Sequence, residues 1–341
     1  MIRSLATDTR SNYGAGLLHF TQFCASIDIP EAKRMPASEA LISQFAAAFT
    51  GTSSEKTLNN WFVGLQFWHV VNGALWCASH LLHHTRRGFA KMVPASACRA
   101  KFPPVTIDAL CILFNNLDLS LLLNVAVCAV ALIAFWCCCR LGELLVPSPN
   151  LFDPLKHVVH LAAPLTSFSV ANETQTHASL FHIPWMKTTK EQGADISITA
   201  RDHHTCPLAA LERHLTVNHD IPPHSSLFTY RTTAGWSHMT CSAFLTCCND
   251  IWVSQGYPNL PGHAFRIGGA TELLLQGVHP NVVTTQGRWS SDAFLDYWHR
   301  IDTILPLFIA SSANTQRLAD LDRVMDSFAR NHHLLQALPS S

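Results

Sequence analysis

The stretch from His263 to Arg300, HAFRIGGATELLLQGVHPNVVTTQGRWSSDAFLDYWHR, decides how the rest of the chain is interpreted. Arg266 follows the histidine by three residues, so both side chains fall on one face of a predicted helix. Gly268 and Gly269 leave the backbone there small enough for a bulky group to approach. A guanidinium suits phosphate because its planar fork donates two parallel hydrogen bonds. The stretch therefore predicts an anion site on successive helices.

Tyr297, in the same stretch, is one of four tyrosines in the chain. It follows Ser290, Ser291 and Asp292, which are residue types that cap a short helix. A phenol acts as a covalent nucleophile when nearby cations stabilise its ionised form. The stretch thus predicts a nucleophile beside the anion site.

The composition predicts a globular chain of two domains. Of its 341 residues, 48% are hydrophobic and 13% are charged, which is ample for buried cores. The formal net charge of zero argues against an indiscriminate binder of polyanions. The charge is nevertheless uneven, because residues 1–101 hold ten Lys and Arg against five acids, hence +5, which leaves −5 for the remainder.

The twelve cysteines include the run Cys137-Cys138-Cys139 but no C-x-x-C pair, and no secretory signal precedes them. They indicate neither a zinc module nor a disulfide framework, so a reducing nucleus or cytoplasm is expected. The adjacent pairs among the twenty histidines lack the spacing of a helical metal site. We therefore expect no metal and no other cofactor.

One apolar run requires a test for membrane insertion. Residues 119–139, LSLLLNVAVCAVALIAFWCCC, are nearly long enough to cross a bilayer. The run passes directly into Arg140-Leu-Gly-Glu143, which has the pattern of more helix. This continuity favours a fully buried central helix of a large domain, and a membrane span is the alternative.

The first third of the chain predicts a small helical domain. Helical patterns cover residues 11–29, a segment after Pro36, residues 55–73 after a capping box at Thr52, and about 76–91. Residues 86–104 then contain prolines, small residues and five cations without an acid: Arg86, Arg87, Lys91, Arg99 and Lys101. This pattern indicates a domain connection, which is either solvated or lies along a phosphate backbone.

From Thr106 the chain predicts a second, mixed domain. A helix starting at Thr106 and the buried run are followed by short β-rich segments at 157–162, 167–170, 179–186 and 194–199. The last two form a hairpin whose tip carries Lys187 and Lys190. Helices return after Pro207, with a short strand at 225–230, a helix at about 238–255 and a terminal helix at 317–335.

The order of these parts resembles the tyrosine recombinase (phage integrase) family, particularly the eukaryotic branch carried by Crypton and DIRS-like mobile elements. An Arg-x-x-Glu helix, a hairpin lysine, His-x-x-Arg, Gly-Arg-Trp and a tyrosine follow one another in the family's order. The match covers the chain from about Thr9 to Ile309. Single pieces are weak, but five in register over about 160 residues are a strong signal.

The resemblance implies a site and leaves two of its positions open. The residues to which it assigns catalytic roles are Arg140, Lys187, His263, Arg266, Trp289 and the nucleophile Tyr297, with Glu143 supporting Arg140. Gly287-Arg288-Trp289 holds one residue more than the family's plain Gly-His or Gly-Trp step, so Arg288 competes with Trp289 for the place beside the phosphate. Lys190 competes in the same way with Lys187.

The implied fold is mainly helical and multidomain. A SAM-like core-binding domain (residues 1–93) and a basic linker (94–104) precede an integrase catalytic domain with a small antiparallel sheet (105–341). The implied function is to cut and rejoin double-stranded DNA through a 3′-phosphotyrosine, without a metal, as a homo-oligomer in the nucleus. A DNA-binding protein of the same fold that no longer cuts, and a nicking-closing activity like that of type IB topoisomerases, are the alternatives.

Overall fold

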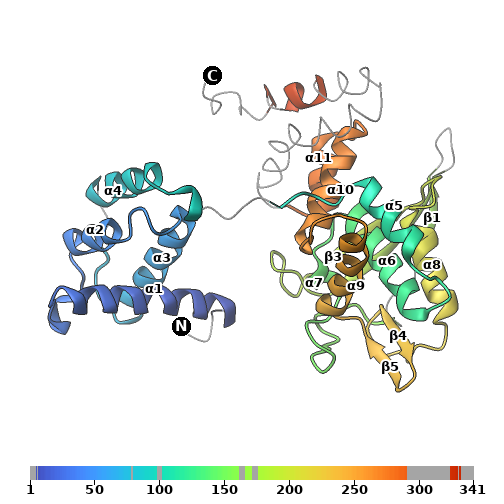
Figure 1. Cartoon of the computed structure of the whole chain (residues 1–341), viewed down its shortest axis with the longest axis horizontal. Coiled ribbons are helices and arrows are strands. Elements are labelled where there is room, and N and C mark those ends of the chain that lie inside the picture. Colours follow the sequence, from blue (N-terminus) through green and yellow to red (C-terminus); the bar gives the residue numbers. More distant parts are fainter. Residues whose placement is uncertain are drawn as a thin grey trace. The chain divides into compact units, whose positions relative to one another are not determined.

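The computed structural model describes residues 5, 7–77, 80–97, 102–160, 166–170, 176–289, 323–328 and 330–331. The chain forms two compact units, residues 1–101 and residues 102–341 (Figure 1). The division falls inside the predicted linker of residues 94–104.

Helices and turns make up the described residues of the first unit, with no strand among them. Ser38 and Ser54 cap the second and third helices by accepting hydrogen bonds from backbone N–H groups, so the expected cap at Thr52 lies two residues too early. The helices of this unit are α1 (Thr7–Ser26), α2 (Glu39–Ala48), α3 (Glu55–Val71) and α4 (His80–Lys91), with 3₁₀ turns at Glu31–Lys33 and Ala95–Ala97.

Aromatic side chains fill the core of the first unit. Phe20, Phe45 and Trp61 are buried, and the Phe20 and Phe45 rings meet edge to face with their centroids 5.5 Å apart. α1 and α3 approach closely because Gly16 lies directly against the backbone of Trp61. The aromatic side chains Trp61 and Phe62 of α3 thus belong to this core.

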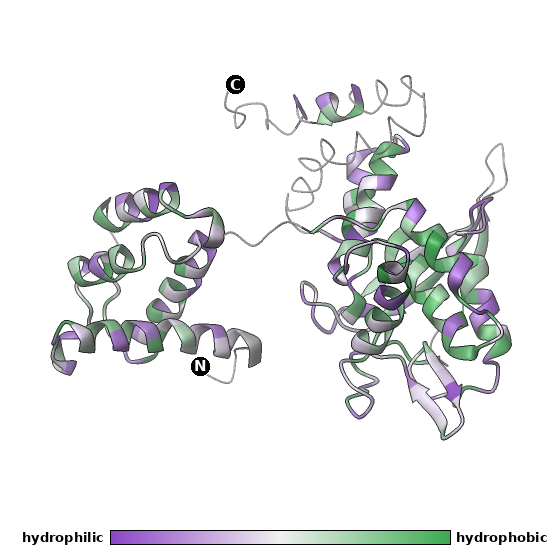
Figure 2. Cartoon of the chain, in the orientation of Figure 1, coloured by the Kyte–Doolittle hydropathy of each residue, from purple (hydrophilic) through white to green (hydrophobic). Residues whose placement is uncertain are grey.

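The second unit surrounds α6 (Leu122–Trp136), in which every residue from Val125 to Trp136 is buried. Figure 2 shows this helix among other hydrophobic segments. Within the part of the chain that the structure describes, no helix is long and apolar enough to cross a membrane. The other helices are α5 (Ile107–Asn116), α7 (Leu141–Leu144), α8 (Pro207–Val217), α9 (Cys241–Ser254), α10 (His263–Leu275) and α11 (Pro280–Gly287).

Contrary to expectation, the buried helix does not pass without a break into Arg140-Leu-Gly-Glu143. α6 ends at Trp136, and Cys138 then adopts a left-handed backbone conformation with φ 48°. The chain turns there, and Arg140 becomes the N-cap of the short helix α7. The turn matters for the site because the backbone carbonyls of Cys137 and Cys138 accept hydrogen bonds from Arg266 and Arg288.

The sheet of the second unit has three antiparallel strands in the order β1-β2-β3. Phe181 and Ile196 are paired across β2 and β3, and both are buried against the helical core. A separate hairpin includes a strand that the sequence did not predict, β5. The strands are β1 (Thr166–Val170), β2 (Thr176–Ile183), β3 (Ala194–Thr199), β4 (Thr229–Thr232) and β5 (Gly235–His238).

The remaining sequence predictions have mixed outcomes. The predicted segment at 157–162 forms only an isolated bridge between Val159 and Ser226 in its described residues. The predicted C-terminal helix is described at residues 323–328 and 330–331, where Met325 and Phe328 are buried in the core of the second unit. Thr106 caps α5 as expected.

Candidate active site

Helix α10 is fixed by two glycines. A side chain on Gly268 or Gly269 would collide with the backbone carbonyls of Val105 and Phe135, respectively. The bulky group that approaches these glycines is therefore the protein's own backbone. The close contact keeps α10 against the end of α6, where the Cys138 turn begins.

Arg266 projects from α10 into this turn and is fully buried. Its Nη1 donates to the carbonyl of Cys138 at 2.5 Å, and its Nη2 donates to the carbonyl of Gly287 at 2.6 Å. The ring of Trp289 covers the guanidinium, with the ring centroid 4.1 Å from Cζ. Both terminal nitrogens are thus engaged by backbone in this structure.

His263 has a different environment, although it lies one turn before Arg266 on the same helix. It is exposed at the start of α10, and its ring meets that of Phe102 with centroids 6.5 Å apart. The i, i+3 spacing therefore placed the two residues correctly on α10, but only the imidazole faces solvent.

Arg140 and Glu143 form a capping box at α7. Nη1 of Arg140 donates to Oε1 of Glu143 at 2.8 Å, and the backbone N–H of Arg140 donates to Oε2 at 3.0 Å. The Arg140 side chain is 35% exposed, whereas that of Glu143 is 6% exposed. The carboxylate therefore holds the arginine from the buried side, and part of the guanidinium remains open to solvent.

Arg288 reaches the same carboxylate from the end of α11. Its Nη2 donates to Oε2 of Glu143 at 2.8 Å, and its Nη1 donates to the carbonyls of Gln286 and Cys137 at 2.6 and 3.2 Å. The residue has a left-handed backbone (φ 57°, ψ 41°), which turns its side chain back toward the protein. Arg288 therefore faces inward, while the half-buried Trp289 lies on Arg266 and fills the space beside Gly287.

Burial of Glu143 opposes its ionisation, but the charge of Arg288 and the hydrogen bonds from Arg140 and Arg288 outweigh burial and lower the pKa of Glu143. The carboxylate is thus ionised at neutral pH. We call Arg140, Glu143, Arg266 and Arg288 the arginine cluster. Its buried negative charge, on Glu143, lies between the guanidiniums of Arg140 and Arg288, and the Arg266 guanidinium shares the Cys138 carbonyl with that of Arg288.

Lys187 and Lys190 lie in the turn between β2 and β3, and both are exposed. Met186 and Lys190 exchange two backbone hydrogen bonds, and Nζ of Lys190 lies 5.5 Å from the ring centroid of Trp185. Among the described residues, neither lysine makes a hydrogen bond or ion pair with the arginine cluster. The competition between them for the role of proton donor therefore stays open.

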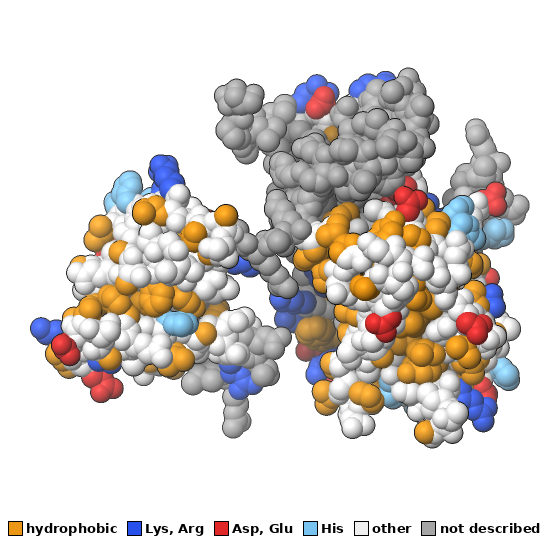
Figure 3. Space-filling model, in the orientation of Figure 1, with side chains coloured by type: hydrophobic (Ala, Val, Ile, Leu, Met, Phe, Trp, Pro, Cys, Tyr) orange, Lys and Arg blue, Asp and Glu red, His pale blue; other side chains and the backbone are white. Residues whose placement is uncertain are grey.

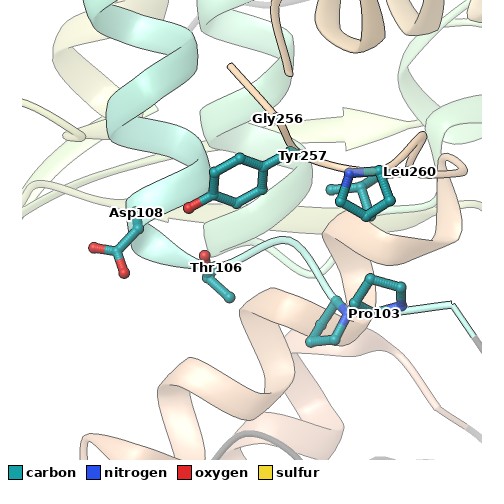
Figure 4. Close-up of a pocket in the computed structure, with 8 residues that line it drawn as sticks. Pro103, Thr106, Asp108, Gly256, Tyr257 and Leu260 are labelled. Atoms are coloured by element: carbon teal, nitrogen blue, oxygen red, sulfur yellow. The ribbon is translucent and has the colours of Figure 1, made fainter. Parts of the chain in front are cut away.

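Tyr297 lies outside the described residues, so its place relative to the cluster stays a prediction. Tyr257 is described and lines a cavity of about 390 Å³ (Figure 4). Its hydroxyl points toward Thr106 and Asp108 in that view, and no member of the arginine cluster lines the cavity.

Three of the cations expected to bind DNA lie on α4. Arg86, Arg87 and Lys91 are exposed, and basic side chains and histidines gather over this helix (Figure 3). Nη2 of Arg86 donates to Oδ1 of Asn59 at 2.5 Å. The other two expected contacts, Arg99 and Lys101, lie outside the described residues. In the described ranges there is no group of three or more His, Cys, Asp or Glu that could hold a metal ion.

Arg201 is a nearby residue that the sequence analysis missed. Its Cζ lies 3.4 Å from the ring centroid of Trp136, and its Nη1 donates to Oε1 of Gln276 at 3.0 Å. These contacts join the segment after β3 to the ends of α6 and α10. No local pattern marks this role, because Trp136 and Gln276 are both distant from Arg201 in sequence.

Comparison with known proteins identifies the fold. The chain is similar to the XerH site-specific recombinase in a post-cleavage complex with palindromic difH substrate, with a TM-score of 0.56 and 14% identity over 91% of this chain and 81% of that one. The chain is also similar to the Tn1549 transposon integrase in complex with transposon right end DNA. The TM-score is 0.47 and the identity 13%, over 84% of this chain and 85% of that one. No family model and no curated protein sequence matches the chain. The fold is that of the tyrosine recombinases, which confirms the predicted mainly helical architecture with a small antiparallel sheet.

Proposed function

We propose that the protein is a tyrosine recombinase that cuts and rejoins double-stranded DNA. The phenolate oxygen of Tyr297 attacks a backbone phosphorus, a 3′-phosphotyrosine bond forms, and the bond from phosphorus to the 5′-oxygen breaks. The leaving 5′-oxygen takes a proton from Lys187 or Lys190. A 5′-hydroxyl from another strand then gives its proton to the neutral lysine and attacks the phosphotyrosine. The bond from phosphorus to the tyrosine oxygen breaks and the phenolate is released, so the energy of the diester is kept and no nucleotide cofactor is consumed.

The observation that carries this proposal is the convergence of three guanidiniums from distant segments. Arg140, Arg266 and Arg288 join one hydrogen-bonded cluster around Glu143 and the Cys138 carbonyl. The three positive charges exceed the single carboxylate charge, so the cluster carries net positive charge. Positive groups fixed in advance favour a transition state in which negative charge grows on the phosphate oxygens. The recombinase fold supports the same conclusion.

Accessibility separates the roles that we assign. Arg140 and His263 are open to solvent and would contact the phosphate directly. Arg266 is buried beneath Trp289, so direct contact of Arg266 with a phosphate requires the tryptophan ring to move. In the arrangement described, Arg266 supports the turn that presents Arg140.

The partners that we propose follow from the reaction. Double-stranded DNA is the substrate, and the exposed cations of α4 would contact its phosphates. Strand exchange joins two duplexes, so the protein would act as a homo-oligomer on paired sites. The nucleus is the compartment that the resemblance to eukaryotic mobile elements suggests.

A nicked suicide DNA substrate tests the proposal, because cleavage on it releases a short fragment and traps the covalent adduct. We expect the wild-type protein to form an adduct stable to denaturing electrophoresis, and Tyr297→Phe to form none while still binding DNA. Tyr257→Phe is the matched control, since Tyr257 lines the separate cavity, and it should retain the adduct. An adduct that persists in Tyr297→Phe would refute the role given to Tyr297.

A second candidate function is DNA binding without cleavage. The observation that favours it is the full burial of Arg266, whose two terminal nitrogens bind backbone carbonyls. Selective binding to a DNA site, with no cleavage of nicked or supercoiled substrate by the wild-type protein, would establish this function in place of the first.

A further inference from the structure

Arg288 is held in a backbone conformation that few side chains adopt. It is one of four non-glycine residues with positive φ in the part of the chain that the structure describes, and it ends α11. A left-handed conformation carries a steric cost that glycine would avoid. An arginine here therefore points to contacts that glycine could not make.

The contacts of Arg288 use both of its terminal nitrogens. Nη1 donates to the carbonyls of Gln286 and Cys137, at 2.6 and 3.2 Å. Nη2 donates to Oε2 of Glu143 at 2.8 Å and to the carbonyl of Cys138 at 3.4 Å. The side chains of Arg288 and Glu143 are only 10% and 6% exposed. The guanidinium is thus committed to the protein and does not face a ligand.

Glu143 connects Arg288 with the solvent-facing Arg140. Oε2 of Glu143 accepts from Arg288 and from the backbone N–H of Arg140, while Oε1 accepts from the Arg140 guanidinium. Without Arg288, Glu143 would be a buried carboxylate with Arg140 as its sole cationic partner, and their pairing would draw the Arg140 guanidinium inward. Arg288 therefore shares the carboxylate charge and leaves part of Arg140 available.

We propose that Arg288 is a positioning residue that acts on the phosphate site through Glu143 and Arg140. The proposal rests on the proposed function only in assigning Arg140 to the phosphate. It also explains why the chain carries Gly-Arg-Trp: the extra residue turns inward and fixes the carboxylate, and the Trp289 ring covers Arg266. A lysine could not replace Arg288, because one ammonium group cannot span the carboxylate and the carbonyls on both sides of it.

The ionisation of Glu143 gives a readout that a merely structural role would not move. The groups that face this carboxylate are Arg140 and Arg288, with the Cys139 thiol close by. Removing Arg288 removes the largest influence that lowers the pKa of Glu143 and leaves burial, which raises it. In Arg288→Met, Glu143 should therefore take up a proton at a higher pH than in the wild-type protein.

The experiment compares Arg288→Met, Arg288→Lys, Glu143→Gln and the double variant Arg288→Met/Glu143→Gln. Arg231→Met is the control, because Arg231 also pairs with a carboxylate, Asp220, but on the surface with 60% of its side chain exposed. Adduct formation on the suicide substrate is measured in single turnover from pH 5.5 to 8.5. Carbon-13 NMR of labelled glutamate follows the titration of Glu143.

We expect Arg288→Met to slow adduct formation on the order of 100-fold, as for a misplaced catalytic group, and to slow it further as pH falls. Arg288→Lys should not restore the rate, and the double variant should lose the added pH dependence. Arg231→Met should match the wild-type protein. An unchanged rate in folded Arg288→Met, or a loss without the pH dependence, would overturn the proposal.

The two readouts separate this proposal from the proposed function. If the wild-type protein binds DNA but forms no adduct, the recombinase activity fails. A raised pKa of Glu143 in Arg288→Met would then still support the coupling of Arg288 to Glu143. If Glu143 titrates alike in both proteins, the positioning role is refuted whether or not the protein cleaves DNA.

Discussion

The molecule presents two groups of cations that differ in burial. On α4, Arg86, Arg87 and Lys91 are exposed to solvent, where salt screens their charges. In the arginine cluster, Arg266 and Arg288 are buried, and their terminal nitrogens bind backbone carbonyls or a carboxylate. The first group is suited to long-range attraction of a polyanion. The second is suited to holding a fixed geometry, and its members depend on one another.

The largest expected effect of this difference is on stability. Arg266→Met removes the charged donor of the buried Gly287 carbonyl and leaves the Cys138 carbonyl with only the longer bond from Arg288, at about 1–3 kcal/mol for each lost bond. Arg87→Met on α4 should change the free energy of unfolding by less than about 0.5 kcal/mol. Urea unfolding followed by circular dichroism measures both. Equal losses of unfolding free energy in Arg266→Met and Arg87→Met would mean that burial of the arginine does not affect stability.

His214 sharpens the comparison, because it is a buried base without a carboxylate partner. Its Nε2 bonds to the Leu227 carbonyl at 3.0 Å, and Nδ1 lies 3.2 Å from the Asn218 amide. Burial lowers the pKa of His214 to about 4, and the nearby His160 lowers it too. Because the folded-state pKa lies below that of the unfolded chain, the unfolded state takes up the proton first, and stability is lost as pH falls below 6.5.

As the pH falls from 7.5 to 5, protonation of His214 in the unfolded state should lower the free energy of unfolding by about 2 kcal/mol. His214→Gln should flatten that part of the stability profile, whereas His219→Gln, at an exposed position of the next turn, should leave it unchanged. A profile that is equally steep in His214→Gln would assign the acid sensitivity to other groups.

Substitutions of the α4 cations should affect the fold least, but they should measurably weaken DNA binding. Replacing Arg86, Arg87 and Lys91 together by Gln should reduce the slope of log K against log salt by about 0.9 for each lost phosphate contact. Fluorescence anisotropy with a DNA duplex at several salt concentrations measures this slope. A triple replacement at Lys156, Arg213 and Arg231 in the second unit serves as control. If the control lowers the slope equally, α4 is not the contact surface.

Features encoded locally could be predicted from the sequence. The helices of the first unit, the burial of α6 and the start of α10 at His263 follow from periodicity and turn residues. The cap of α3 does not follow from residue type alone, since Thr52 and Ser54 are both suitable and only the backbone conformation selects Ser54.

Features that depend on distant partners could not be predicted. The helix pattern continues through Cys138, but the turn there depends on contacts with Arg266 and Arg288, which lie far along the chain. The spacing of His263 and Arg266 fixes their common face on α10, yet not that one is exposed and the other buried. The inward direction of the Arg288 side chain likewise follows from the left-handed backbone of Arg288, which the sequence Gly-Arg-Trp does not predict.

Val105, near the start of the second unit, contacts the first turns of α10 through its backbone. The backbone N–H of Val105 donates to the carbonyl of Ala264 at 3.0 Å, and the carbonyl of Val105 lies against Gly268. The segment that contains Val105 cannot slide without moving the first turn of that helix. One peptide group thus joins the segment before α5 to the residue that follows His263.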